Sequence, residues 1–258
     1  MITTHATRRV TIPCGSTTLY GDLSWPIATD RVHSLIVVVH PSSGSRLNPR
    51  NQALAAALNR IGHATLLTDL LGTDEDQWAA SAAKARYDVA LLTSRLRTVV
   101  DRVARLEVEV AALPVAVLGT GTAALAALRA AAELSEARSD DGTAAAGGPP
   151  PPRAGRIDAV VCRHAGAGAG PDLLDGVDDT EAPTPRRGTV VPALFLVAEH
   201  DHETQDVHRR ARAAQRGDLV EVPGARDLVA DAVAVEAVAE LSGQWITSRL
   251  DPARAPRT

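Results

Sequence analysis

Val115-Ala-Val-Leu-Gly-Thr-Gly-Thr-Ala-Ala-Leu125 is the stretch that decides the fold of this chain. The apolar run from Val115 to Leu118 predicts a buried strand, and the alanine-rich residues after Thr122 predict a helix. The turn between them matches a nucleophile elbow, in which the pattern G-x-S-x-G presents a reactive Ser or Cys between a strand and a helix. That place falls on Gly121, which has no side chain to attack a carbonyl. The sequence therefore predicts an elbow without a nucleophile.

Strand and helix patterns alternate on both sides of this elbow. The predicted strands are residues 9–14, 18–25, 34–40, 63–71, 113–119, 156–162, 189–198 and 218–222, and the predicted helices are residues 51–61, 79–107, 122–138, 204–214 and 228–250. The first two strands read as an edge hairpin. Such alternation predicts an α/β fold: a mostly parallel, doubly wound sheet with helices on both faces and any site at the carboxyl ends of the strands.

We expect a single domain over residues 1–258, because this length and 45% apolar content suit one α/β core. Residues 139–152 have no apolar period and contain four consecutive prolines, which predicts a disordered insertion. The tail from Asp251 is expected to fray.

Composition argues against several classes of partner. The net charge is -4 and only 2% of residues are aromatic, so neither a basic surface nor stacking platforms for nucleic acid are expected. No uncharged apolar run is long enough for a membrane span, and no leader pattern opens the chain, so we expect a cytoplasmic protein that does not bind membranes. The two cysteines lie in apolar runs and read as small core residues.

Several segments in fixed order carry a family resemblance. They are His40-Pro-Ser-Ser-Gly-Ser-Arg46, Asn48-Pro-Arg-Asn51, Tyr87-Asp-Val89, the elbow, Leu194-Phe-Leu-Val-Ala-Glu-His-Asp201 and Val220-Glu-Val-Pro-Gly-Ala225. With them, residues 35–250 resemble an α/β-hydrolase of the dienelactone-hydrolase-like group. The resemblance implies the α/β-hydrolase fold and a triad in the order nucleophile, acid, histidine.

The resemblance also implies which positions of the triad are lost. Asp201 stands where the family places the acid that orients the imidazole. Asp227 stands where the histidine is expected, and Gly121 stands where the nucleophile is expected. We therefore expect a degenerate triad and no catalytic residue.

An anion-binding pocket could remain even though the triad is expected to be degenerate. His40 resembles the first residue of the family's oxyanion loop, although Pro41 replaces the usual glycine and has no N–H to donate. The backbone N–H groups of Ser42 and Thr122 could still form a pocket at the start of the predicted helix. The residues expected around this pocket are His40, Ser42, Ser43, Thr120 and Thr122.

Nucleotide cofactors are not expected. Gly119-x-Gly121-x-x-Ala124 also satisfies the dinucleotide pattern G-x-G-x-x-G/A. However, this pattern normally follows the first strand of the fold and requires an acidic residue at the end of the second strand. Here the acidic residues at that distance, Asp140 and Asp141, lie in the predicted insertion. A phosphate-binding P-loop would need Gly-Lys-Ser/Thr, which is missing from this turn.

A rebuilt catalytic site is the main alternative. The possible substitute nucleophiles are Ser42, Ser43, Thr120, Thr122 and Cys162, and the possible bases are His40, His164, His200 and His202. Such a pair needs a base within about 3 Å of the hydroxyl or thiol. The run from His200 to Glu203 suggests a metal site only weakly, because adjacent residues point in different directions, so no metal is expected.

These observations favour a degenerate α/β-hydrolase retained for binding a small-molecule ligand or a protein partner. The alternative is an active dienelactone-hydrolase-like enzyme, either an ester or lactone hydrolase with a rebuilt site or a lyase, isomerase or cyclase that moves a proton without a covalent step.

Overall fold

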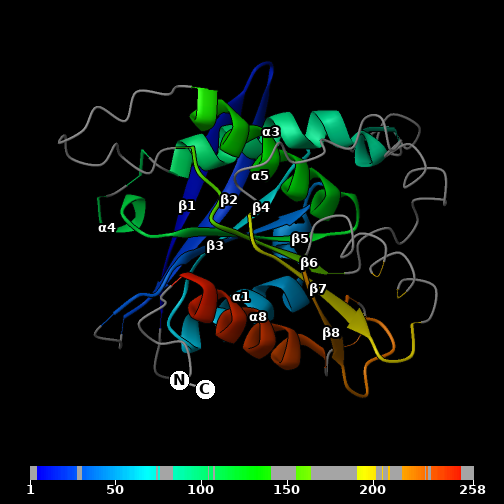
Figure 1. Ribbon diagram of the computed structural model, residues 1–258. Helices are drawn as coiled ribbons and strands as arrows, with labels where there is room; N and C mark the ends of the chain where they lie inside the picture. Colours follow the sequence, from blue (N-terminus) through cyan, green and yellow to red (C-terminus); the bar gives the residue numbers. More distant parts are fainter. Residues whose placement is uncertain are drawn as a thin grey trace.

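The computed structural model describes residues 5–27, 31–73, 75, 84–103, 105–106, 108–140, 155–163, 191–201, 205, 209, 217–229, 231 and 234–250. These residues form one eight-stranded sheet with helices on both faces (Figure 1). The strands are β1 (His5–Cys14), β2 (Thr17–Pro26), β3 (Leu35–His40), β4 (Ala64–Asp69), β5 (Val115–Thr120), β6 (Ala159–Arg163), β7 (Ala193–Ala198) and β8 (Asp218–Val222). The helical elements are η1 (Ser45–Leu47), α1 (Pro49–Arg60), α3 (Val89–Val103), α4 (Val108–Ala111), α5 (Thr122–Asp140) and α8 (Ala234–Leu250).

The strand order is β1-β2-β4-β3-β5-β6-β7-β8. The β1–β2 hairpin pairs antiparallel, as does β2 with β4, and the remaining neighbours pair parallel. This confirms the predicted doubly wound, mostly parallel sheet and the edge hairpin. The chain moves outward from β3 to β4 and then returns past β3 to β5, so the sheet reverses direction between β3 and β5. Ligand sites of such folds lie beside this reversal, at the carboxyl ends of the strands.

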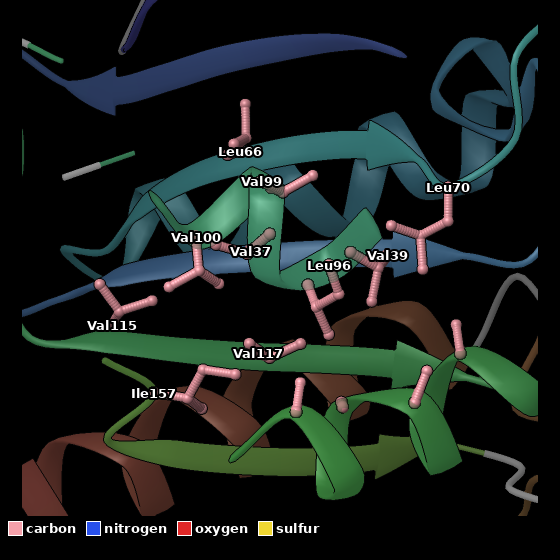
Figure 2. Close-up of a cluster of buried hydrophobic side chains, with 14 of the residues drawn as sticks. Val37, Val39, Leu66, Leu70, Leu96, Val99, Val100, Val115, Val117 and Ile157 are labelled. Carbon is pink, nitrogen blue, oxygen red and sulfur yellow. The ribbon is translucent and has the colours of Figure 1, made fainter. Parts of the chain in front are cut away.

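The core has two parts, one on each face of the sheet. The strands from β3 to β7 are buried along their whole length, as expected for β-branched runs covered on both faces. On one face, α3 and α5 pack against residues such as Val37, Leu66 and Val117 (Figure 2). On the other face, α1 and α8 lie side by side over Val38 and Leu118 (Figure 1).

The structure corrects the boundaries of three predicted helices. The pattern over residues 228–250 places the start of a helix too early, because α8 begins at Ala234. The pattern over residues 79–107 predicts one long helix, but α3 ends at Val103, and the amides of Arg105 and Leu106 bond to carbonyls only three residues back. The short α4 follows separately. Helix α5 runs to Asp140, so it includes the first two residues of the predicted insertion.

Several expectations fall on residues outside the described part. They concern residues 141–152 of the insertion, residues 164–187 of a Gly-, Asp- and Pro-rich loop predicted over 163–187, most of the predicted helix 204–214 and the tail 251–258. Among the described residues, no helix is long and apolar enough to cross a membrane.

Candidate functional site

The turn between β5 and α5 has the backbone of a nucleophile elbow. Gly121 has a φ of 60°, in the left-handed region that favours glycine. Its N–H bonds to the carbonyl of Arg163 at 3.3 Å, and its carbonyl accepts the amide of Ala124 at 3.0 Å. A Cβ added at Gly121 would have no described atom within 4 Å. The turn therefore leaves space for a side chain that the sequence does not supply.

Gly119 has a different role at the same turn. A Cβ added there would lie 2.6 Å from the Cα of Ala124, which is closer than atoms can approach without a shift. The first turn of α5 thus crosses β5 in direct backbone contact. This close crossing explains why the pattern needs a glycine before the turn as well as within it.

A buried arginine lies beside the elbow. Arg163 ends β6, where it pairs in register with Thr120, and its side chain is 2% exposed. Its Nε donates to Thr120 Oγ1 at 3.1 Å. Its Nη2 donates to His40 Nε2 at 3.3 Å and to Asn51 Oδ1 at 3.4 Å. One guanidinium therefore joins the carboxyl ends of β3, β5 and β6 to helix α1.

Sequence reasoning did not identify Arg163 or Asn51 as site residues. The predicted strand 156–162 ends one residue too early, because Arg163 is the last residue of β6. A charged residue at the end of a strand next to the elbow strand was the signal that could have identified it, because parallel strand ends meet at one edge. Asn51 gave no such signal, since it lies within a helical pattern.

The charge state of this cluster follows from burial. Burial lowers the pKa of Arg163 to about 10, and the attraction of Asp227 opposes the shift, so the guanidinium stays positively charged at neutral pH. Burial and then the charge of Arg163 lower the pKa of His40 to about 3, although a hydrogen bond with Asn51 opposes them. His40 is therefore neutral. Since arginine can only donate, His40 Nε2 is an acceptor and the ring proton lies on Nδ1.

The loop after His40 is fastened by Asp69 at the end of β4. The Asp69 carboxylate accepts the backbone amides of Gly44 at 2.9 Å and of Arg46 at 3.0 Å. Burial raises the pKa of Asp69, while these two N–H groups and the charge of Arg46 act in the opposite direction. Ser42 and Ser43 lie half-buried in this loop.

The hydroxyl groups near the elbow have local partners. The hydroxyl of Ser42 bonds to that of Ser45, and Thr120 accepts from Arg163. The hydroxyl of Thr122 donates to the backbone carbonyl of Arg86. In the part of the chain that the structure describes, these bonds do not join a hydroxyl to a histidine.

Two of the remaining candidates for a rebuilt site, Cys162 and His200, are poorly placed for catalysis. Cys162 is fully buried, and burial raises its pKa, so it is a protonated thiol in the core. His200 is exposed, with Nε2 4.0 Å from Glu199 Oε2. His164 and His202 lie outside the described residues.

The positions of the expected acid and histidine lie on adjoining loops. The amides of Glu199 and His200 bond to the carbonyls of Val222 and Ala225, each at 3.3 Å, which ties the end of β7 to the end of β8. Asp201 follows the first of these loops. Asp227 follows the second, where its Oδ1 accepts the amide of Val229 at 2.6 Å.

No cluster of three or more metal-ligating side chains occurs among the residues with described placement.

Comparison with known proteins gives one curated relative in two strains and many solved structures. No family model matches the chain. A Mycobacterium tuberculosis protein of strain H37Rv, with the provisional name phosphoribosyl transferase, is 32% identical over 244 residues, and the alignment covers 93% of this chain but 46% of that protein. The same values hold for its counterpart in strain CDC 1551. The chain thus spans about half the length of the curated relatives it matches.

The similar solved structures are mainly hydrolases. A dienelactone hydrolase from Anabaena variabilis has a TM-score of 0.72 at 27% identity, covering 96% of this chain and 99% of that one. A dienelactone hydrolase-like promiscuous phosphotriesterase from metagenomic libraries has a TM-score of 0.63 at 18% identity, with 96% and 99% covered. Est1E from Butyrivibrio proteoclasticus has a TM-score of 0.63 at 17% identity, with 93% and 98% covered.

Proposed function

Because the chain has the α/β-hydrolase fold and its structural neighbours are dienelactone-hydrolase-like, we propose that it is a degenerate hydrolase that binds a ligand or partner at the elbow without forming a covalent intermediate. The observation that carries this proposal is Gly121, which has the backbone angle of the nucleophile but only a hydrogen for a side chain.

The groups around the elbow support this proposal. A base must accept a proton near neutral pH, and His40, with a pKa lowered to about 3, is a poor base there. Its Nε2 also faces the guanidinium of Arg163 and not a hydroxyl. Asp227 stands where the family has an imidazole and attracts the guanidinium of Arg163, so a carboxylate occupies the place of the proton-accepting ring.

The curated relative suggests which ligands to screen first. Its provisional name describes a phosphoribosyl transferase, and a phosphoribosyl substrate carries phosphate groups. That relative is about twice as long as the matched region, so we transfer no transferase activity to this chain. We infer only that phosphate esters should be tested first in a ligand screen.

The test is reaction with a serine-directed fluorophosphonate, followed by intact-mass spectrometry, together with hydrolysis of p-nitrophenyl acetate. We expect no mass increase and no hydrolysis above that of heat-unfolded protein. An active dienelactone hydrolase serves as the positive control. Stoichiometric labelling that maps to one residue would show that a rebuilt nucleophile exists and would overturn the proposal.

A further inference from the structure

We propose that His33 and His63 form a pH-sensitive contact, which keeps helix α8 on the sheet while both rings are neutral and releases it when they bind protons. The pair lies at the amino ends of β3 and β4, because Ser34 and His63 directly precede these two parallel strands. It is therefore at the opposite edge of the sheet from Gly121, and the inference does not depend on the function proposed for the elbow.

The ring of His63 is buried between the sheet and α8. His63 follows shortly after the end of α1 and is 1% exposed. Its Nδ1 lies 2.9 Å from the hydroxyl oxygen of Ser34. On the other side, the ring forms a hydrogen bond with the backbone of Gly243, and its Nε2 lies 3.5 Å from the hydroxyl oxygen of Thr247. Gly243 and Thr247 belong to α8, so one imidazole joins this helix to the start of β3.

Two glycines allow the close packing around the pair. A Cβ added at Gly243 would lie 3.1 Å from His63 Nε2, so α8 approaches the ring with its backbone. A Cβ added at Gly62 would lie 2.8 Å from Cδ2 of His33. The centroids of the two imidazole rings are 5.6 Å apart, and their planes are tilted by 56°. The pair thus occupies the junction where α8 meets the ends of α1, β3 and β4.

The surroundings make a proton on His63 costly while α8 is in place. Burial, and then the charge of His33, lowers the pKa of His63 to about 4, and the hydrogen bond with Gly243 opposes this shift. The other described charged residues on the adjoining elements are exposed, namely Arg31 before His33, Arg50 and Arg60 of α1, and Glu236, Glu240 and Arg249 of α8. Arg60 pairs with Glu236 at 2.5 Å, and Arg249 pairs with Asp218.

Release of α8 is linked to proton uptake. When the helix leaves, the ring of His63 faces water, and its pKa returns to its ordinary value of about 6.5. The released state therefore binds more protons below that pH, and its population rises as the pH falls toward 4. Protons on both rings would also repel each other across 5.6 Å. Between about pH 7.5 and about pH 5, the equilibrium constant for release should rise about 30-fold.

Helix α8 can leave without displacing a strand. It follows β8 in the chain and is the last of the described elements, so the strand pairing of the sheet does not run through it. Its release exposes Val235, Val238 and Ile246, which are buried against the sheet and α1. This apolar contact favours the docked helix while the histidines are neutral.

Hydrogen exchange of the full chain at pH 7.5 and pH 5, followed by mass spectrometry and corrected for the intrinsic exchange rates, measures the release. We expect the protection factors of the α8 amides to fall about 30-fold at the lower pH. Helix α5, on the other face of the sheet, is the internal reference. Exchange in α8 should depend less on low urea concentrations than exchange in α5, because release of one helix exposes less surface than global unfolding.

Two variants assign the effect to the histidine pair. His63→Gln should remove most of the pH-dependent change in α8, because glutamine does not bind a proton in this range. His33→Gln removes the repelling charge and should make the change smaller. It also keeps the test decisive where His63→Gln does not fold, since His33 is only half-buried. His200→Gln, which removes an exposed histidine after β7, is the matched control and should keep the full change.

Three results would overturn the inference, and any one of them is enough. The first is equal protection of the α8 amides at the two pH values. The second is the same urea dependence in α8 and α5, which would mean that acid unfolds the whole molecule at once. The third is a full pH response of α8 in folded His63→Gln or in His33→Gln. The fluorophosphonate test of the proposed function is unaffected by any of these outcomes.

Discussion

Gly119 and Gly121 stand two residues apart, but they are required for different reasons. At Gly121 the φ of 60° disfavours any side chain, while the space around it is open. We expect Gly121→Ala to lower the free energy of unfolding by about 1 kcal/mol, the usual cost of a left-handed L-residue. Gly119→Ala should lower it by about 2 to 3 kcal/mol, because its Cβ would overlap the backbone of α5. Urea unfolding of both variants measures the difference, and equal losses would contradict this distinction.

A second prediction at this scale concerns the triad that we propose to be degenerate. Gly121→Ser alone should give almost no esterase activity, because His40, the described histidine beside the elbow, has a pKa lowered to about 3 and is a poor base for the new hydroxyl. Gly121→Ser combined with Asp227→His should give measurable hydrolysis of p-nitrophenyl acetate, since the imidazole then stands on the loop adjoining that of Asp201.

The single variant Asp227→His is the matched control for this experiment, and it should be inactive because triad residues act as a unit. Activity of Gly121→Ser equal to that of the double variant would mean that another residue already serves as base. An inactive but folded double variant would show that position 227 does not correspond to the triad histidine.

At the scale of elements, the loop that follows β3 depends on one carboxylate of β4. Asp69→Asn keeps one acceptor oxygen but loses the charge that holds the amides of Gly44 and Arg46. We expect a loss of about 1 to 2 kcal/mol and faster hydrogen exchange at these two amides. Asp22→Asn removes a more exposed partner of Arg46 and should cost less than about 1 kcal/mol. Exchange at Gly44 that is the same in both variants would argue against the anchor.

The strands of the sheet could be predicted, but the polar cluster at their ends could not. Composition alone predicts the strands over residues 34–40 and before Gly119. A strand that is covered on both faces is apolar along its whole length, and both segments show this pattern. Arg163 lies beside the elbow because β6 pairs with β5. This pairing is set by the strand order of the sheet, which the local sequence around Arg163 does not reveal. The helix predicted over 79–107 is too long, because the apolar period of the sequence continues past the end of α3. The amides of Arg105 and Leu106 bond to carbonyls three residues back, and these bonds form a turn there.

At the scale of the whole molecule, two buried histidines couple folding to pH. His63 bonds to the hydroxyl of Ser34 through Nδ1 at 2.9 Å, and burial together with the charge of His33 lowers the pKa of His63 to about 4. His40 is lowered to about 3. In the unfolded chain both pKa values return to about 6.5, so the unfolded state binds more protons below that pH. The free energy of unfolding is therefore highest above about pH 6.5, and it decreases as the pH falls from there toward the pKa values of the folded state.

This coupling predicts a loss of roughly 2 kcal/mol for each histidine between about pH 7.5 and about pH 5. Urea unfolding at the two pH values measures it. His63→Gln serves as the comparison, and it should reduce the pH-dependent part by about half whatever its effect on absolute stability. A pH dependence in His63→Gln that matches the original protein would exclude His63 as a source.

The backbone of the turn at Gly121 also has an evolutionary consequence. The angle, the open space and the close helix crossing that a nucleophile requires are already in place, so they need not be acquired again. A glycine codon of the form GGT or GGC differs from a serine codon by one base, and every aspartate codon differs from a histidine codon by one base. With a GGT or GGC codon at position 121, one base change at each of positions 121 and 227 would supply the serine and the histidine that the proposed degenerate triad lacks.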